Sequence, residues 1–132
     1  MITNMHHVGI VVKSLDEAIP MYEGGLGLSV SKVTASEKDG VKIAFMPAGE
    51  TLIELLEPAS PTSSIARFLE TRGEGMHHIA IQVDDIVAHM KRLEAAGAIL
   101  IDKTPRQGAE GLVAFVHPKS MKGVLIELVQ AA

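Results

Sequence analysis

The sequence predicts an α+β fold in which two tandem βαβββ modules form a curved mixed sheet around a metal site. Three observations predict it: a repeat offset by about half the chain, the same order of strand and helix patterns in both halves, and a length of 132 residues that suits one domain. We expect a single domain over 1–132. Module one covers 1–58, a linker and short helix cover 59–74, and module two covers 75–132.

The repeat keeps its register over three separate segments, which a chance match would not do. Two segment pairs have an offset of 71 residues and the third has an offset of 73. The pairs are 5–12 with 76–83, 40–47 with 111–118, and 52–55 with 125–128. The two extra residues fall within 119–123, where a turn between strands would absorb them. The chain therefore reads as a duplicated unit.

Each half contains a strand, a helix and three further strands. In the first half, Ser14 and Asp16 suit a helix start, the Gly24-Gly25 pair ends the helix, and Pro20 should kink it or delay its start. A second helix, Ile86–Ala96, stops at Gly97, and a short helix after the linker carries Ile65, Phe68 and Leu69. The expected strands are 4–12, 28–35, 41–46, 51–56, 98–102, 112–117 and 124–129, with one more at the start of module two and a hairpin turn at 38–40.

The composition excludes several classes of protein. Hydrophobic residues make up 47% of the chain and charged residues 21%, which supports a folded core. Cysteine is absent, so there are no disulfides or thiolate metal ligands, as in a reducing compartment. No apolar stretch approaches the about 20 residues of a membrane span, no signal peptide is readable, and the net charge of −4 is dispersed. We expect a cytoplasmic protein that binds neither membranes nor nucleic acid.

One histidine of each His-His pair is predicted to face a ligand site. Side chains alternate across a strand, so His6 and His77 share their faces with aliphatic residues that would pack under helices. His7 and His78 have small or polar neighbours, which suit an open face of a sheet. A lone strand histidine is usually structural, and His6, His77, His89 and His117 are assigned that role.

Two strand glutamates recur in the same way. Glu54 and Glu127 each lie within an aliphatic strand, where burying a carboxylate is costly without a partner or a cation. A lone strand glutamate is usually solvent-facing, but equivalent positions in both halves favour a shared role. His7, Glu54, His78 and Glu127 together offer two nitrogen and two oxygen ligands. Such a set suits Co²⁺, Mn²⁺, Ni²⁺ or Zn²⁺ better than Mg²⁺.

These residues resemble the vicinal oxygen chelate (glyoxalase) superfamily, whose paired βαβββ modules enclose a divalent metal. Within it the chain most resembles the methylmalonyl-CoA epimerases, nearly end to end. The motifs are His6-His7-Val8-Gly9-Ile10, Glu54-Leu55-Leu56-Glu57-Pro58, Gly75-Met76-His77-His78-Ile79-Ala80, Val83-Asp84-Asp85-Ile86, and Phe115-Val116-His117-Pro118-Lys119-Ser120 continuing through Gly123-Val124-Leu125-Ile126-Glu127-Leu128. The last of these is the most specific.

The resemblance implies particular roles. His7, His78 and Glu127 match the family's metal ligands, and Glu54 stands where some members have glutamine. Some epimerases carry a further catalytic glutamate at the place of Ile43, so this chain lacks that base. Glu127 is then expected to be one proton-transfer base and Glu54 the other. No residue is assigned to an organic cofactor.

The implied reaction is the metal-dependent interconversion of (2R)- and (2S)-methylmalonyl-CoA by 1,1-proton transfer through a metal-stabilised enolate. The substrate would be a small acyl-CoA, with Lys103, Arg106, Lys119 and Lys122 as candidate phosphate partners, and the family resemblance implies a homodimer. Two alternatives remain: glyoxalase I (lactoylglutathione lyase), which also uses a His/Glu/His/Glu metal set, and a non-catalytic small-molecule-binding protein of the same fold.

Overall fold

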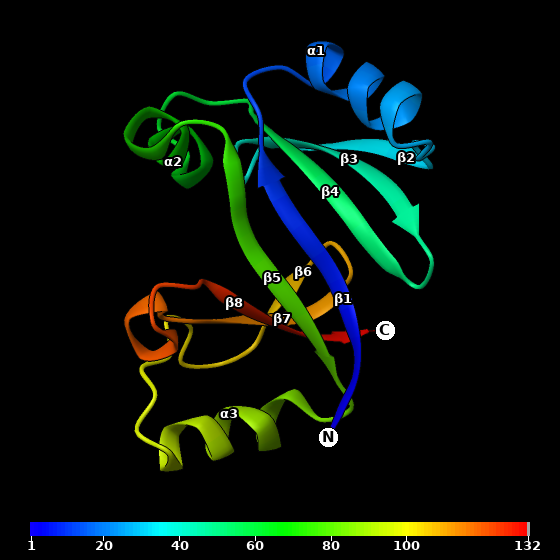
Figure 1. Ribbon diagram of the computed structural model, residues 1–132. Helices are drawn as coiled ribbons and strands as arrows, with labels where there is room; N and C mark the ends of the chain where they lie inside the picture. The colour runs from blue at the N-terminus through cyan, green and yellow to red at the C-terminus, as the bar shows by residue number, and fades with distance from the viewer. Residues whose placement is uncertain (132) are drawn as a thin grey trace. The chain divides into compact units, whose positions relative to one another are not determined.

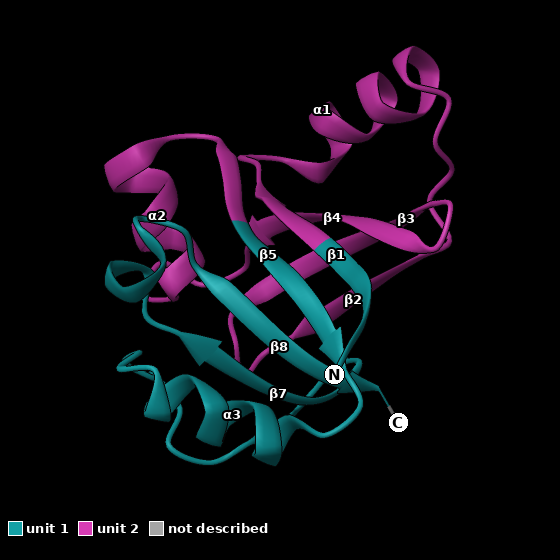
Figure 2. Cartoon of the chain, turned by 60° about the horizontal axis from the view of Figure 1, so that its bottom comes forward, with its two compact units in different colours: residues 1–7, 78–132 teal, residues 8–77 magenta. Residues whose placement is uncertain are grey.

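A computed structural model of the chain describes residues 1–131, which form two compact units (Figures 1 and 2). Unit one comprises Met1–His7 and His78–Ala132, and unit two comprises Val8–His77. The first and fifth strands each contribute residues to both units, because the boundaries fall inside them.

Both halves of the chain follow the predicted order of one strand, one helix and three strands, and a further helix joins them. The elements are β1 (Ile2–Val11), α1 (Leu15–Pro20), η1 (Met21–Gly25), β2 (Lys32–Ser36), β3 (Val41–Ala48), β4 (Thr51–Pro58), α2 (Ser64–Arg72), β5 (Gly75–Val83), α3 (Ile86–Ala95), β6 (Arg106–Gly108), β7 (Gly111–Val116), η2 (Pro118–Met121) and β8 (Ile126–Ala131).

Unit one contains a mixed sheet with the strand order β1-β5-β8-β7-β6. Strand β5 runs parallel to β8, while β8 with β7 and β7 with β6 are antiparallel. The start of the chain joins β5, since the Asp84 N–H donates to the Met1 carbonyl at 3.2 Å. The parallel pair places Ala80 opposite Glu127, and the antiparallel pair places Phe115 opposite Glu127. Glu127 is therefore held in a central strand.

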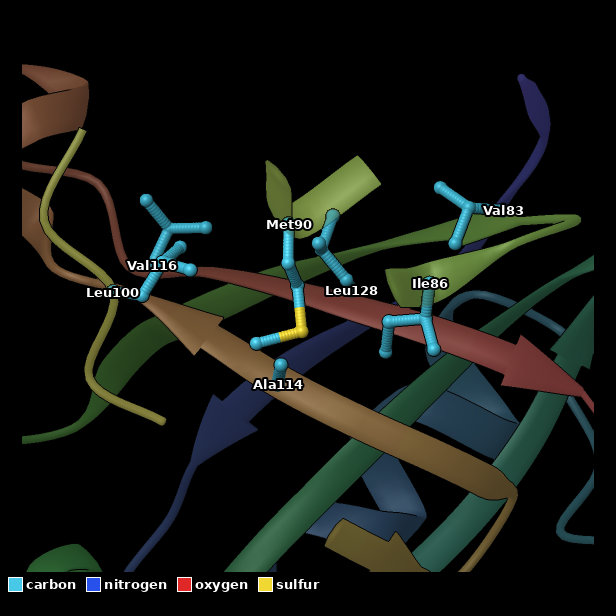
Figure 3. Packing of buried hydrophobic residues seen from close by; sticks show 7 residues of the cluster. All are labelled: Val83, Ile86, Met90, Leu100, Ala114, Val116 and Leu128. Carbon is cyan, nitrogen blue, oxygen red and sulfur yellow. The ribbon is translucent and has the colours of Figure 1, made fainter. Parts of the chain in front are cut away.

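Helix α3 covers one face of the unit one sheet. Asp85 caps its start by accepting a hydrogen bond from the Ala88 N–H at 3.1 Å. Ile86, Met90 and Leu93 recur at helical spacing and pack against the sheet. Figure 3 shows Met90 reaching toward Ala114 of β7, among the side chains of Val83, Ile86, Leu100, Ala114, Val116 and Leu128. The side chains of Ala80 and Glu127 lie on the opposite face of this sheet.

Unit two has the strand order β2-β3-β4-β1, and the α-helices α1 and α2 pack on it. Helix α1 packs through Leu15 and Ala18 onto Ala44, Met46 and Leu55 of the sheet. Helix α2 packs separately through Ile65, Phe68 and Leu69 onto the other cluster, which contains Val11, Val41, Ile43 and Leu56. These two apolar clusters fix the strand that carries Glu54.

Two local expectations changed in the structure. Residues 98–102 do not form a strand, because only Leu100 makes an isolated bridge, to Val116, and the strand forms instead at Arg106–Gly108. The prediction at 98–102 was wrong because the pairing with β7 stops at Ile101, where the Phe115 N–H donates to the Asp102 carboxylate at 2.7 Å and not to a backbone carbonyl. Pro20 does not delay the first helix; α1 starts at Leu15, and the turns widen to a π-helix after Pro20, where the Leu26 N–H reaches the Met21 carbonyl.

None of the helices formed within residues 1–131 is both long enough and apolar enough to cross a bilayer.

The hairpin turn predicted at 38–40 is confirmed, because it connects the paired strands β2 and β3. The division of the chain into two modules, with boundaries at 58 and 75, stays a prediction.

The α3 core gives a stability prediction. Met90 is 4% exposed, whereas Val87, on the same helix, is 48% exposed. Met90→Ala should lower the free energy of unfolding by about 2–5 kcal/mol, because it leaves a cavity against Ala114. Val87→Ala should change it by less than about 0.5 kcal/mol. Urea titrations of both variants test this, and equal effects would contradict the packing described.

Candidate metal centre

Three of the four predicted ligands meet within unit one. His7 comes from β1, His78 from β5 and Glu127 from β8. The Nε2 atoms of His7 and His78 lie 2.9 Å apart. The Oε1 atom of Glu127 lies 3.2 Å from the first and 3.1 Å from the second. All three residues are buried, with relative exposures of 1%, 6% and 8%.

Strand register explains why these side chains meet. Ala80 of β5 is paired with Glu127 of β8, and His78 lies two residues before Ala80, so His78 and Glu127 share one face of the sheet. The alternate residues Ile81 and Val83 pack on the opposite face, under α3. Ala80 adds no more than a methyl group beside Glu127, which leaves room for polar atoms. The predicted choice of the second histidine in the β5 pair agrees with this arrangement.

The triangle of three ligand atoms fits a divalent cation. Ligand atoms bound at about 2.1 Å and at right angles to one another lie about 3.0 Å apart, whereas a tetrahedral ion spreads them to about 3.4 Å. The observed separations of 2.9, 3.1 and 3.2 Å match one face of an octahedron better than one face of a tetrahedron. Two imidazole nitrogens and one carboxylate oxygen are also the donor types that transition metals accept. The residues present therefore fit a metal.

The electrostatics of the three residues are coupled. Burial of the Glu127 carboxyl would by itself raise its pKa, but hydrogen bonds from His7 and His78, and the charge on those rings, lower the pKa from 4.5 to about 2. Glu127 is therefore ionised at neutral pH despite its burial. A buried carboxylate held in its charged form can bind a cation or accept a proton.

The other side of the His7 ring faces a residue that the sequence did not single out. The Nδ1 atom of His7 lies 3.1 Å from Oε2 of Glu110, in the turn between β6 and β7, and 2.9 Å from Nδ1 of His6. His6 Nδ1 lies 3.4 Å from the same carboxylate oxygen. Burial is the largest effect on His6 and lowers its pKa, against the opposing charge of Glu110. His6, assigned a structural role, thus lies beside a ligand.

A sequence signal for Glu110 existed but was ambiguous. At the repeat offset of 71, Glu110 corresponds to Asp39, so both copies carry an acidic residue before the turn glycine. In unit two, however, Asp39 accepts a hydrogen bond from the Ser36 hydroxyl and closes its own turn. An acidic turn residue is usually explained by such local bonding.

Glu54, the fourth predicted ligand, lies on β4 in unit two and is 2% exposed. It is paired with Phe45 of β3 in the antiparallel register. Ile43, on β3, packs with the apolar cluster beneath α2, so no carboxylate occupies that place. Glu54 is thus a buried carboxylate within an aliphatic strand, as the sequence predicted.

The remaining predicted positions have other partners. His77 packs edge-on against Phe68, and His117 caps η2 by accepting from the Lys119 N–H at 3.0 Å. Of the candidate phosphate partners, Arg106 bonds Asp102 and lies over the ring of Phe115, which itself contacts the His78 ring. Lys103, Lys119 and Lys122 are exposed.

Comparisons with known proteins point to one family. Residues 6–116 match the model of the Glyoxalase/Bleomycin resistance protein/Dioxygenase superfamily. The chain is 41% identical to the ethylmalonyl-CoA/methylmalonyl-CoA epimerase of Cereibacter sphaeroides, over 98% of this chain and 99% of that protein. The chain belongs to the methylmalonyl-CoA epimerase family of this superfamily. The predicted fold class and family resemblance are thereby confirmed.

Solved structures of the family agree. The methylmalonyl-CoA epimerase of Mycobacterium tuberculosis matches with a TM-score of 0.92 and 37% identity, over 99% of this chain and 89% of that one. Another methylmalonyl-CoA epimerase, solved in complex with methylmalonyl-CoA and NH4⁺, matches with a TM-score of 0.93 and 32% identity, over 100% of this chain and 96% of that one. Both matches extend over nearly the whole of each chain.

The lowered pKa of Glu127 predicts a pH dependence of stability in the metal-free protein. Because the folded-state pKa is about 2 and the ordinary value is 4.5, the stabilisation is complete above pH 4.5 and is lost as the pH falls toward 2. The stability difference between the parent protein and Glu127→Gln should shrink by on the order of 3 kcal/mol over that range.

Urea titrations at several pH values measure this difference. Glu94→Gln, on the exposed surface of α3, serves as the control and should follow the parent protein at every pH. A Glu127→Gln curve that also runs parallel to the parent would show that the carboxylate is not held in its charged form.

Proposed function

We propose that this chain is an isomerase that interconverts (2R)- and (2S)-methylmalonyl-CoA by moving one proton off C2 and returning one to the opposite face. The family supports the reaction. The observation in the structure that carries the proposal is the buried, ionised Glu127, hydrogen-bonded to two histidines. A proton on carbon between a thioester and a carboxylate is acidic enough to be removed by a carboxylate only when the developing negative charge is stabilised.

His7, His78 and Glu127 would hold a divalent metal, with Glu54 as the proposed fourth ligand. When bound, the metal supplies Lewis-acid stabilisation of the charge that develops on the substrate oxygens, worth several kcal/mol. Within the predicted set of Co²⁺, Mn²⁺, Ni²⁺ and Zn²⁺, the right-angled spacing of the triangle favours the first three, which accept six ligands, over Zn²⁺, and Co²⁺ is the proposed ion used in the tests below.

Glu127 is proposed as one of the two bases. Its carboxylate is ionised at neutral pH, which is the form that accepts a proton, and loosening of its contacts with His7 and His78 would raise its low pKa toward that of a working base. Strand β8 fixes its backbone between β5 and β7, and Phe115 lies opposite in the register, so the carboxylate approaches the substrate from a fixed direction. Apolar neighbours also exclude water from this carboxylate, which is 8% exposed. Rigid placement of a base is a large part of its effect.

Glu54 is proposed as the second base. Epimerisation needs an acid or base on each face of the planar intermediate. Ile43 cannot serve, because its aliphatic side chain has no group that accepts a proton and packs with Leu56 and Ile65. Glu54 is the counterpart of Glu127 in the repeat and is likewise buried within an aliphatic strand, which supports its assignment.

The partner is proposed to be the acyl-CoA substrate, with Arg106 and the exposed Lys103, Lys119 and Lys122 as candidate contacts for its phosphates. A cytoplasmic homodimer is proposed from the sequence. Apolar side chains that remain exposed on unit one, Ile99, Ile101 and Val124, support a surface that a second copy could cover.

The experiment is a D2O exchange assay of the cobalt-loaded protein. With (2R)-methylmalonyl-CoA, deuterium should appear at C2 together with the (2S) form, as followed by mass spectrometry and chiral analysis. Absence of exchange together with turnover of the methylglyoxal–glutathione adduct would assign glyoxalase I instead. Inertness toward both substrates would leave a binding protein of the same fold.

Single variants separate the two bases. If Glu127 and Glu54 serve opposite faces, Glu127→Gln and Glu54→Gln should each slow interconversion by at least about 100-fold. Each variant should still exchange the C2 proton of one enantiomer, and the two variants should retain opposite enantiomers. Bound cobalt is measured in each sample so that loss of metal is not mistaken for loss of a base. Glu94→Gln is the control, and full activity in Glu127→Gln would remove its assignment as a base.

A further inference from the structure

The unit one sheet carries Arg106 at its edge, on the same face as Glu127. Phe115 of β7 is paired with Glu127, and Val113, two residues before Phe115, is paired with Arg106 of the edge strand β6. Val113 packs with Ala80, which lies on the face away from α3. Residues paired across strands, and residues two apart within a strand, share a face. Arg106, Phe115 and Glu127 therefore form one row across the sheet.

Asp102 and the Phe115 ring hold the Arg106 side chain in place. One carboxylate oxygen of Asp102 accepts a hydrogen bond from Arg106 Nε at 3.2 Å, and the other accepts one from the Phe115 N–H at 2.7 Å. The guanidinium carbon lies 5.5 Å from the centre of the Phe115 ring, and the side chain is 43% exposed. A guanidinium has five N–H donors, and across residues 1–131 the structure gives it one hydrogen bond, from Nε. The donors of both terminal nitrogens are therefore available to a ligand.

The Phe115 ring also connects Arg106 to the metal site. Its centre lies 5.8 Å from that of the His78 ring, so the guanidinium is no farther from the His78 ring than this separation and the 5.5 Å contact together. In a malonyl-type thioester the free carboxylate is separated from the thioester carbonyl by a single carbon, whereas the phosphates of coenzyme A lie beyond the whole pantetheine arm. With the thioester at the metal site, Arg106 is thus placed for the acyl end of the substrate.

Unit two, described by itself, repeats this arrangement around its own glutamate. Phe45 is paired with Glu54, and Nζ of Lys32 lies 5.0 Å from the centre of the Phe45 ring. The two phenylalanines are 70 residues apart and the two glutamates 73, so the sequence repeat did not align them. A cation over the phenylalanine opposite each buried glutamate favours a functional role over chance. The unit one copy has a planar guanidinium, which matches a carboxylate better than an ammonium does.

We propose that Arg106 binds the free carboxylate of the acyl group and makes the site specific for malonyl-type thioesters over acyl thioesters that lack this carboxylate. Two terminal N–H groups of a guanidinium can donate to both oxygens of one carboxylate. The positive charge would also lower the cost of forming a second negative charge when C2 loses its proton. The inference rests on the proposed function for the place of the thioester, and it leaves the exposed lysines as candidate phosphate contacts.

The test compares malonyl-CoA with acetyl-CoA, which differ by one carboxylate. Their binding to cobalt-loaded protein is measured by isothermal titration calorimetry, and bound cobalt is measured in each variant. The parent protein should prefer malonyl-CoA. Arg106→Gln should weaken binding of malonyl-CoA by about 10–100-fold and leave that of acetyl-CoA unchanged, because it removes one charged hydrogen-bonding group from the carboxylate. Unchanged binding of acetyl-CoA also shows that the variant is folded.

Two further variants sharpen the comparison. Arg106→Lys should lose less affinity for malonyl-CoA than Arg106→Gln, because it keeps the charge but not the planar pair of donors. Arg92→Gln is the matched control, since Arg92 is exposed on α3, which covers the other face of the sheet. It should bind both ligands as the parent protein does.

The outcomes separate this inference from the proposed function. Equal weakening of both ligands in Arg106→Gln would place the side chain on the phosphates of coenzyme A and overturn the assignment. Unchanged binding of malonyl-CoA, or no preference for it in the parent protein, would also overturn it. If Arg106→Gln loses malonyl-CoA selectively but the parent protein shows no C2 exchange in D2O, the carboxylate site stands and the epimerase assignment fails.

Discussion

Burial of the Glu127 carboxylate against two histidine rings is the interaction on which the chemistry of unit one depends. Moving a carboxylate out of water is costly, and it stays ionised here only because His7 and His78 lie within 3.2 Å of it. A cation bound between the three atoms would offset the same cost more effectively. The same three residues therefore explain a lowered pKa in the metal-free protein and a binding site for a divalent ion in the loaded one.

The sheet makes this cluster possible because each strand has two faces. In unit one the sheet face under α3 is aliphatic and closely packed, with Val83 and Leu128 among its residues, and it anchors the strands. The other face is then free to carry His78 and Glu127, placed side by side by the parallel pairing of β5 and β8. One face of these strands therefore packs against the core and the other carries the polar site. This is why aliphatic residues alternate with histidine and alanine along β5.

That alternation is also why much of the site could be predicted from the sequence. The repeat identified His7, His78, Glu54 and Glu127, and strand parity selected one histidine of each pair. The position of Glu110 beside His7 was not predicted, because Asp39, its counterpart in the repeat, is hydrogen-bonded to Ser36 within its own turn. The strand predicted at 98–102 was wrong because the Asp102 side chain accepts the Phe115 N–H that a continuing strand would need, and the local sequence pattern does not show such pairing. The widened turns after Pro20 likewise depend on which carbonyls the following N–H groups can reach.

The central claim is that His7, His78 and Glu127 hold one divalent ion with right-angled geometry. Titration of the metal-free protein with Co²⁺, followed by electronic absorption, tests it most directly. We expect one equivalent of Co²⁺ to bind with the weak absorption bands of six-coordinate cobalt, and His78→Ala to lose tight binding. Intense bands of four-coordinate cobalt, or unchanged binding in His78→Ala, would contradict it.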